Sequence, residues 1–277
     1  MPALAQAADA GSAPGAAPGF VQVPHDWEIG FQAPGSPVQV RIEQLHDLIL
    51  VIITAIVLFV AALLAYVMWR YRASVHPQAS RVSHHTWLEV AWTILPALLL
   101  VVIAIPSFRL VYFEDRAKNP DMTVKVTGHQ WYWNYEYPDQ GDFNFDSYMV
   151  QDEDLKPGQY RHLSVDNAVV IPVGKAIRIL TTSADVIHSF FIPALGVQRY
   201  AIPGRVIETW VQANKPGTYF GECNQICGTN HSVMPIEVRA LSQPDFDAWA
   251  QDAKKKFAAV AAPPPAGSGT RLAAVAP

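Results

Sequence analysis

The sequence is short of charged residues, of cysteine and of any excess of basic side chains. Only 16% of its 277 residues are charged, against roughly 25% in an ordinary soluble domain, whereas 51% are hydrophobic. This deficit indicates that part of the chain lies in a membrane. The formal net charge of −4 argues against a nucleic-acid partner. Two cysteines are too few for a disulfide scaffold, and no Cys-x-x-Cys-His motif for haem attachment is present.

The two cysteines lie in one stretch with two other potential metal ligands. In YFGECNQICGTNHSVMPI, Cys223 and Cys227 are followed by His231 and Met234, which gives the spacing Cys-x3-Cys-x3-His-x2-Met. Soft sulfur donors with imidazole suit copper, and a second thiolate lets two sulfurs bridge two metal ions. Such a site needs a second histidine from elsewhere in the chain, and His188 is the best candidate.

Three alternatives explain less of this pattern. A disulfide is plausible in an oxidising compartment, but it leaves the spacing of the histidine and the methionine unexplained. Zinc is a poor match, because methionine is a poor zinc ligand and Cys-x3-Cys is not the usual structural spacing. Buried cysteines without a function are common, but they would not account for four coincident donors. The pattern therefore favours copper.

Two long apolar stretches precede this region. Residues 48–69 carry no charge over 22 positions, which is enough for a helix to span the roughly 30 Å hydrocarbon core. The second stretch, about 88–110, contains Pro96 and Pro106, which membrane helices tolerate. The loop between them carries three arginines and no acid. The positive-inside rule therefore predicts that this loop is cytoplasmic and that both termini lie outside.

The chain after about residue 122 changes to short alternating or aromatic runs separated by Pro-Gly and Asp-Asn turns, which predicts an all-β sandwich or barrel. After Leu241 the pattern is that of an amphipathic helix capped by Ser242. The expected divisions are a flexible N-terminal leader at 1–40 that begins like the end of a signal peptide, a transmembrane helical hairpin at 41–114, an extracytoplasmic β-domain at 115–241, a C-terminal helix at 242–260 and a disordered tail at 261–277.

An aromatic run, WYWNYEY at residues 131–137, breaks the alternation expected of a strand, because aromatic side chains fall on both faces. Core packing and an aromatic band at the membrane interface are the ordinary interpretation. Between residues 114 and 166, eleven acids stand against five bases. Such an excess usually marks a solvated surface, but it can also steer a basic partner.

These motifs resemble subunit II of cytochrome c oxidase. GECNQICGTNHSVMPI is similar to the binuclear CuA loop of that family, and the likeness extends over GHQWYWNYEY, FDSYM, DVIHSF, AIPGR and WTILPA. It covers about residues 40 to 250. The resemblance implies a two-helix transmembrane hairpin followed by an all-β, cupredoxin-like Greek-key barrel, with copper ligands on the loop between the last two strands.

The resemblance also implies a function and a location. The chain would be the electron-accepting subunit of a respiratory oxidase in the bacterial inner membrane, with both termini and the CuA domain on the periplasmic side. It would take electrons from cytochrome c and pass them to haem in subunit I, where oxygen is reduced to water and protons are pumped. Its other partners would be subunit III and the lipid bilayer.

A set of copper ligands follows from the resemblance. The two cysteines would bridge two copper ions; one ion would also take the first histidine and the methionine, and the other the second histidine and the backbone oxygen of Gln225. Gln225 stands where the family usually carries a glutamate that ligates magnesium or manganese at the border with subunit I. An amide is a poorer ligand for such a hard cation, so a weakened site is expected. The side-chain copper ligands implied are His188, Cys223, Cys227, His231 and Met234.

The resemblance assigns roles to further residues. Trp131 corresponds to the surface point at which electrons enter from cytochrome c. Glu89, which the sequence alone explains as an acid favoured by the helix dipole, stands where the family places an acid at the mouth of a proton channel into the catalytic subunit. The acids implied in partner docking are Glu136, Asp139, Asp142 and Asp185.

Two other function classes compete with this interpretation. A quinol oxidase subunit II that has lost copper is disfavoured, because all five side-chain ligands are present. A secreted redox or copper-delivery module is disfavoured, because the sequence contains the helical hairpin. Copper content would distinguish the first, and membrane integration the second.

Overall fold

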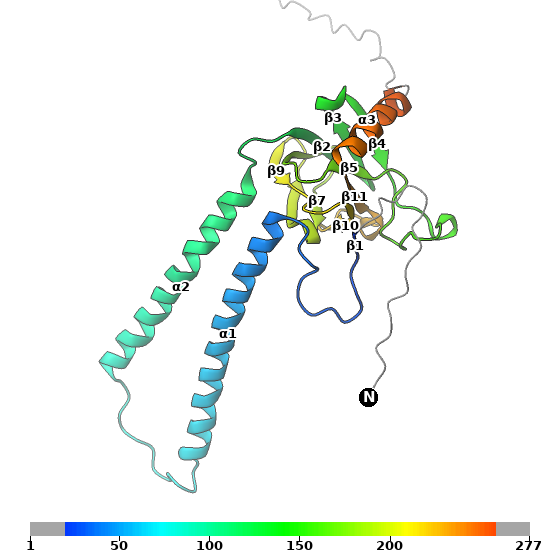
Figure 1. Cartoon of the computed structure of the whole chain (residues 1–277). Helices are drawn as coiled ribbons and strands as arrows, with labels where there is room; N and C mark the ends of the chain where they lie inside the picture. Colours follow the sequence, from blue (N-terminus) through cyan, green and yellow to red (C-terminus); the bar gives the residue numbers. More distant parts are fainter. Residues whose placement is uncertain (1–19, 259–277) are drawn as a thin grey trace, which may run out of the picture.

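The computed structural model describes residues 20–258. Within this range, two long helices, α1 (Pro37–Arg70) and α2 (Thr86–Asp115), extend together from one side of a β-domain (Figure 1). Both are long and apolar enough to cross a membrane, and the most apolar window of each is not buried within the chain. The predicted stretches 48–69 and 88–110 lie inside them. The helices are longer because apolar composition marks only the part suited to lipid.

The predicted flexible leader, 1–40, is ordered in part. β1 (Phe20–Gln22) pairs in parallel with β10 (Gly217–Cys223). Ser36 is buried and caps α1, because its Oγ accepts a backbone N–H of the first turn at 2.9 Å and donates to the carbonyl of Leu195 at 2.7 Å. These contacts join segments far apart in the sequence, which local composition does not reveal.

The β-domain of the described residues consists of two sheets. The first has the strand order β5-β11-β10-β7-β8, with β1 paired on β10, and the second has the order β4-β3-β2-β6-β9. The expected fold, a two-helix hairpin followed by a cupredoxin-like barrel, is confirmed. The remaining strands are β2 (Met122–His129), β3 (Tyr132–Tyr137), β4 (Phe143–Ser147), β5 (Val169–Pro172), β6 (Ile177–Ser183), β7 (His188–Ile192), β8 (Val197–Ala201), β9 (Ile207–Val211) and β11 (Pro235–Leu241). Short 3-10 helices are η1 (Pro138–Gln140), η2 (Asp152–Asp154), η3 (Pro193–Leu195) and η4 (His231–Val233).

Side chains of β2, β3, β4 and β6 alternate between buried and more exposed positions, as packing of one sheet face on another requires. The strands β5, β10 and β11 of the other sheet are buried at nearly every position. β3 buries Trp133, Tyr135 and Tyr137 completely and leaves the residues between them partly exposed. Aromatic side chains do fall on both faces, because Tyr132 lies on the outer face and stacks between His129 and Tyr148. The strand nevertheless keeps its alternation of buried and partly exposed positions.

The C-terminal helix expected over 242–260 is α3 (Gln243–Ala258). Ser242 caps it by accepting a backbone N–H of the first turn at 3.4 Å. Trp249 packs against aromatic rings of β3 and β4, so the helix covers one end of the core. The tail predicted at 261–277, like the start of the predicted leader, lies outside the described residues.

Side chains of the β-domain hold the end of α2. The indole of Trp210 donates to the carbonyl of Phe113 at 2.8 Å. The carbonyl of Glu114 accepts from Thr209 Oγ1 at 3.2 Å and from Arg199 Nη2 at 3.3 Å. The last carbonyls of a helix have no partner within the helix, and here β8 and β9 supply partners. The β-domain is thereby attached directly to the helical hairpin.

Candidate metal centre

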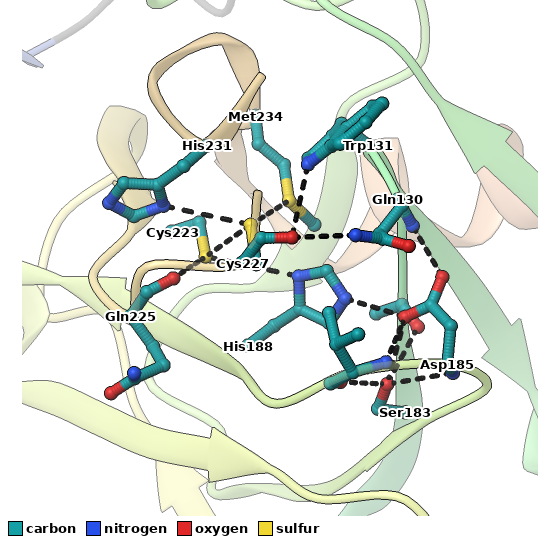
Figure 2. A network of polar contacts seen from close by, with 12 residues as sticks. Gln130, Trp131, Ser183, Asp185, His188, Cys223, Gln225, Cys227, His231 and Met234 are labelled. Carbon is teal, nitrogen blue, oxygen red and sulfur yellow. Dashed lines mark hydrogen bonds and ion pairs between the residues drawn. The ribbon is translucent and has the colours of Figure 1, made fainter. Parts of the chain in front are cut away.

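The predicted ligands gather where the end of β10 meets the start of β7 (Figure 2). Cys223 is the last residue of β10, and the loop over residues 224–234 leads from it to β11. His188 is the first residue of β7, which pairs with β10 beside Cys223. The sheet therefore places an imidazole next to cysteines that follow it by 35 residues or more.

Five side chains face one another at this point. The sulfur of Cys223 lies 3.9 Å from the sulfur of Cys227 and 4.0 Å from Nδ1 of His188. The sulfur of Cys227 lies 3.7 Å from Nδ1 of His231 and 4.0 Å from Sδ of Met234. The fold thus brings together all five side chains that the sequence nominates as copper ligands.

The donor set fits copper. Both cysteines are free and buried, so the disulfide alternative does not describe this structure. The backbone oxygen of Gln225 lies 3.4 Å from the sulfur of Cys223, and its side-chain amide points away from the cluster (Figure 2). Two thiols, two imidazole nitrogens and a thioether are donors that suit copper, whereas the thioether makes zinc a poor match.

The two thiols differ in acidity. Burial raises the pKa of the Cys223 thiol, but hydrogen bonds from His188 and the adjacent backbone outweigh it and lower that pKa to about 7. Burial, together with the neighbouring Cys223 thiolate, raises the pKa of Cys227 to about 12. Two thiolates side by side therefore repel each other unless a cation lies between them. Metal binding would remove this repulsion and release the second proton.

A carboxylate orients the ring of His188. Oδ1 of Asp185 accepts from Nε2 of His188 at 2.9 Å and from the backbone N–H of Val186 at 2.6 Å. Oδ2 accepts the backbone N–H of Gln130 at 2.7 Å. Since Nε2 donates to the carboxylate, Nδ1 is the ring nitrogen that faces the sulfur of Cys223, and it would become a ligand once a metal ion displaces the proton that it shares with the thiolate. This is the arrangement that metal-ligating histidines usually show.

The side chain of Trp131 contacts the backbone of one residue of this cluster. Its indole Nε1 donates to the carbonyl of Cys227 at 3.3 Å, and the side chain is only partly buried. Gly228 allows the loop to come this close, because a Cβ at that position would lie 2.8 Å from Cζ2 of Trp131. A partly exposed π-system is thus one hydrogen bond away from a predicted ligand.

Two residues of this site are missed by sequence reasoning. The side chain of Gln130 donates to the carbonyl of Cys227 at 2.7 Å. The indole of Trp133 donates to the carbonyl of Met234 at 3.3 Å, and its ring lies 5.9 Å from that of His188. Their closeness to Trp131 in the sequence is the one feature that could have pointed to them. Nothing in the sequence shows that the β2–β3 hairpin lies over the loop at residues 224–234.

The four predicted docking acids do not form one cluster. Only Asp185 among them contacts the metal site. Glu136 pairs with Lys125 at 2.7 Å, and Asp139 accepts the backbone N–H of Thr123 at 2.7 Å. Both lie toward the opposite end of the β2–β3 hairpin from Trp131, roughly 17 Å along the strand at about 3.4 Å per residue. Exposed Asp142 follows in the next turn.

Glu89 lies in the first turn of α2, at the far end of the hairpin from the β-domain (Figure 1). Its Oε1 accepts the backbone N–H of His85 at 3.2 Å, while Nδ1 of His85 accepts the N–H of Leu88 at 3.3 Å. Reciprocal bonds of this kind resemble a capping box. The helix-start role is therefore satisfied within the chain, and the proton-channel role stays a prediction.

Two membrane-spanning helices that carry a β-domain with a sulfur-rich candidate metal site define a membrane-anchored, cupredoxin-like protein. The family models narrow this class. "Cytochrome C oxidase subunit II, periplasmic domain" matches residues 122–241, and "Cytochrome C oxidase subunit II, transmembrane domain" matches residues 24–110. The chain belongs to the cytochrome c oxidase subunit II family, and it is thus a subunit of a haem–copper oxidase with a membrane hairpin and a periplasmic domain.

Similar proteins agree with this family. A probable cytochrome c oxidase subunit 2 from Rickettsia bellii is 47% identical over 240 residues, which cover 87% of this chain and 89% of that protein. The mitochondrial cytochrome c oxidase subunit 2 of Vigna unguiculata is 45% identical over 234 residues, which cover 82% of this chain and 62% of that protein. The crystal structure of the periplasmic domain of subunit II (CoxB) of Bradyrhizobium japonicum is 50% identical, with a TM-score of 0.49, and covers 51% of this chain and 99% of that chain.

Proposed function

We propose that this chain is the electron-accepting subunit of the oxidase, and that its loop between β10 and β11 holds a CuA centre of two copper ions. The observation that carries the proposal is the cluster of five side chains with neighbouring donor atoms 3.7–4.0 Å apart. When bound, the copper pair supplies transfer of one electron at a time between cytochrome c and the haem of subunit I. Reduction of oxygen to water and proton pumping would follow there.

Each ligand is held in place by the fold. The bridging sulfurs would be those of Cys223 and Cys227, one fixed by a strand and the other by its loop. His188 and Met234 would complete one copper, while His231 and a backbone oxygen of the loop would complete the other. Buried surroundings exclude water from the thiolates, which favours rapid transfer with little rearrangement. The same five side chains disfavour a quinol-oxidase role.

Docking of cytochrome c would take place over Trp131. This side chain is partly exposed and bonded to a ligand backbone, so a bound partner could reach it without penetrating the domain. Asp185 supplies negative charge beside it, and Glu136, Asp139 and Asp142 supply charge farther along the hairpin. Charges at that distance would raise the association rate through long-range steering.

The membrane arrangement completes the proposal. With Arg70 at the end of α1 and with Arg72 and Arg81 in the loop that follows, the positive-inside rule predicts that this loop is cytoplasmic and that both termini lie on the periplasmic side of the bacterial inner membrane. Subunits I and III would pack beside the hairpin in the bilayer. Glu89, at the cytoplasmic end, would then lie where subunit I could receive protons.

The proposal is tested on the purified whole oxidase with Cys227→Ser and with Ser232→Ala, which changes an exposed residue of the same loop. Cys227→Ser should remove the binuclear near-infrared signal and the oxidation of cytochrome c, while the haem spectrum of subunit I stays unchanged. Ser232→Ala should resemble wild type in copper content and activity. A Cys227→Ser enzyme that keeps two copper ions and their mixed-valence spectrum would exclude the assignment.

A further inference from the structure

Gln130 connects two separate parts of the metal site. Its backbone N–H donates to Oδ2 of Asp185, whose other oxygen holds the ring of His188. Its side-chain Nε2 donates to the carbonyl of Cys227, the same oxygen that accepts the indole N–H of Trp131 (Figure 2). One residue therefore contacts both the histidine side and the cysteine side of the cluster.

The Gln130 bond is the stronger of the two bonds to the Cys227 carbonyl. It measures 2.7 Å, whereas the bond from Trp131 measures 3.3 Å, beyond the usual range for an N–H donor. The residue after Cys227 is Gly228, with φ +127°, and glycine restrains the adjoining peptide less than other residues do. The orientation of the Cys227 carbonyl thus depends on the side-chain amide of Gln130, which donates to it.

The loop and the hairpin fit together tightly at this place. A Cβ on Gly228 would lie 3.0 Å from Nε2 of Gln130 and 2.8 Å from Cζ2 of Trp131. A small rotation of the Cys227 peptide would therefore change the contact with the indole directly. Gln130 itself is exposed, so water competes for its amide and the bond has the modest net strength of an accessible hydrogen bond.

We propose that Gln130 is a positioning residue for electron uptake, whose side-chain amide holds the Cys227 carbonyl against the indole of Trp131. This inference rests on the proposed function. Without the amide, the peptide would spend part of its time turned away from Trp131, and the observed transfer rate would fall with the fraction of molecules in the competent geometry. A lost bond of about 1 kcal/mol corresponds to about a fivefold change in the equilibrium constant between the two peptide orientations, which is the upper limit of the change in the competent fraction.

The test uses the whole oxidase with Gln130→Leu, whose side chain is one atom shorter and has no donor, and Gln130→Glu, which places an acceptor oxygen against the carbonyl. Gln151→Leu is the matched control, because the amide of Gln151 also donates to a backbone carbonyl, that of Met149 at 3.3 Å, away from the site. Flash photolysis of a ruthenium-labelled cytochrome c measures transfer within the preformed complex. Copper content and the hyperfine couplings of the cysteine Cβ protons are measured on the same samples.

Both Gln130 variants should transfer electrons more slowly within the complex, by up to about fivefold, with two copper ions retained and cytochrome affinity unchanged for Gln130→Leu. The Cβ proton couplings of one cysteine should shift, since they depend on the dihedral angle about its Cβ–Sγ bond. Gln151→Leu should match wild type in all of these. Wild-type rates and couplings in both Gln130 variants, or loss of copper from them, would overturn the positioning role. If the purified wild-type enzyme were found to contain no copper, that result would instead refute the proposed function.

Discussion

Nε2 of His188 donates to Oδ1 of Asp185 at 2.9 Å, so an acid predicted for partner docking also orients a predicted copper ligand. The carboxylate is engaged on both oxygens, since Oδ2 accepts the backbone N–H of Gln130. These bonds lower the pKa of Asp185 despite the opposing effect of burial. Asp185 should therefore influence the metal site as well as the approach of a basic protein.

The first prediction separates these two effects. Asp185→Asn should weaken copper binding by about 10- to 100-fold, the usual cost of losing a carboxylate partner of a ligating histidine. It should also lower the association rate of cytochrome c and the salt dependence of that rate. Competition titration of the copper-free enzyme and stopped-flow mixing at two ionic strengths measure these quantities.

Asp139→Asn is the control for this prediction. Its carboxylate accepts only a backbone N–H of β2 among the described residues and is remote from the ligands. The substitution should lower the association rate without changing copper affinity. If Asp185→Asn bound copper as tightly as Asp139→Asn does, the orienting role of Asp185 would be wrong.

The second prediction concerns Trp131. Trp131→Ala should slow electron transfer from bound cytochrome c severely, because it removes both the exposed π-system and the bond to Cys227. Trp131→Phe keeps a ring and loses the N–H, so its rate should lie between those of Trp131→Ala and wild type. Docking affinity should change little in either variant. Wild-type transfer in the Trp131→Ala complex would show that electrons enter elsewhere.

The cluster of candidate ligands was largely predictable because four of its five members lie within twelve residues of one another in the sequence. His188 was harder, since its distance from Cys223 is set by the pairing of β7 with β10 and by no local spacing. The sequence could nominate it as the best candidate but could not place it. The membrane helices were predictable for a simpler reason, because uninterrupted apolar composition is a local property.

Contacts between distant segments were not predictable. The strand at Phe20–Gln22 pairs with β10, and although Phe20 and Val21 favour strands, three residues are too short a run to predict one from sequence. The double role of Asp185 and the contact of Gln130 with the copper loop depend on how hairpin and loop meet. Glu136 and Asp139 are close to Trp131 in the sequence, but the extended strand β3 separates them from it in space, and their docking role stays a prediction.

The third prediction tests the attachment of the N-terminal strand. A Cβ on Gly217 would lie 1.9 Å from the carbonyl oxygen of Phe20, so Gly217→Ala should displace β1. We expect a loss of about 1–3 kcal/mol in the free energy of unfolding, typical of overpacking, and faster proteolysis near Phe20. Gly174→Ala is the control for backbone strain alone, because Gly174 has a positive φ of +76° but open space around it, so it should leave proteolysis near Phe20 unchanged. Slow proteolysis in both variants would mean that β1 tolerates the substitution.

The fourth prediction is a pH dependence. Oδ2 of Asp121 accepts the backbone N–H of Ala176 at 2.8 Å, and Oδ1 contacts Lys175 at 3.1 Å; these bonds, the first being the larger effect, lower the pKa of Asp121. A lowered folded-state pKa stabilises the protein above the unfolded-state pKa, and the contribution disappears as pH falls through the folded-state pKa.

Asp121→Asn should therefore be less stable than wild type at pH 7, and the difference should shrink as pH falls below about 4. Lys175→Ala should reduce the pH-dependent contribution without abolishing it, because the backbone N–H of Ala176 remains. Denaturant unfolding of the detergent-solubilised protein at several pH values measures this. A difference between wild type and Asp121→Asn that is constant with pH would contradict the assignment.

The last prediction concerns Gln225, which stands where a carboxylate is expected by family resemblance. Its backbone oxygen faces Cys223, while its side-chain amide points away from the sulfurs (Figure 2). Gln225→Glu should therefore leave the copper spectrum almost unchanged, because every residue type supplies the backbone oxygen.

The outward side chain of Gln225 is free to meet a hard cation at the border with subunit I. Such a cation prefers a charged oxygen, so Gln225→Glu should bind Mn²⁺ more tightly. Titration of Mn²⁺ into metal-depleted enzyme, followed by electron paramagnetic resonance, measures the affinity, with Gln225→Ala as the control for loss of the amide. Equal affinities in all three proteins would show that this side chain is not a ligand.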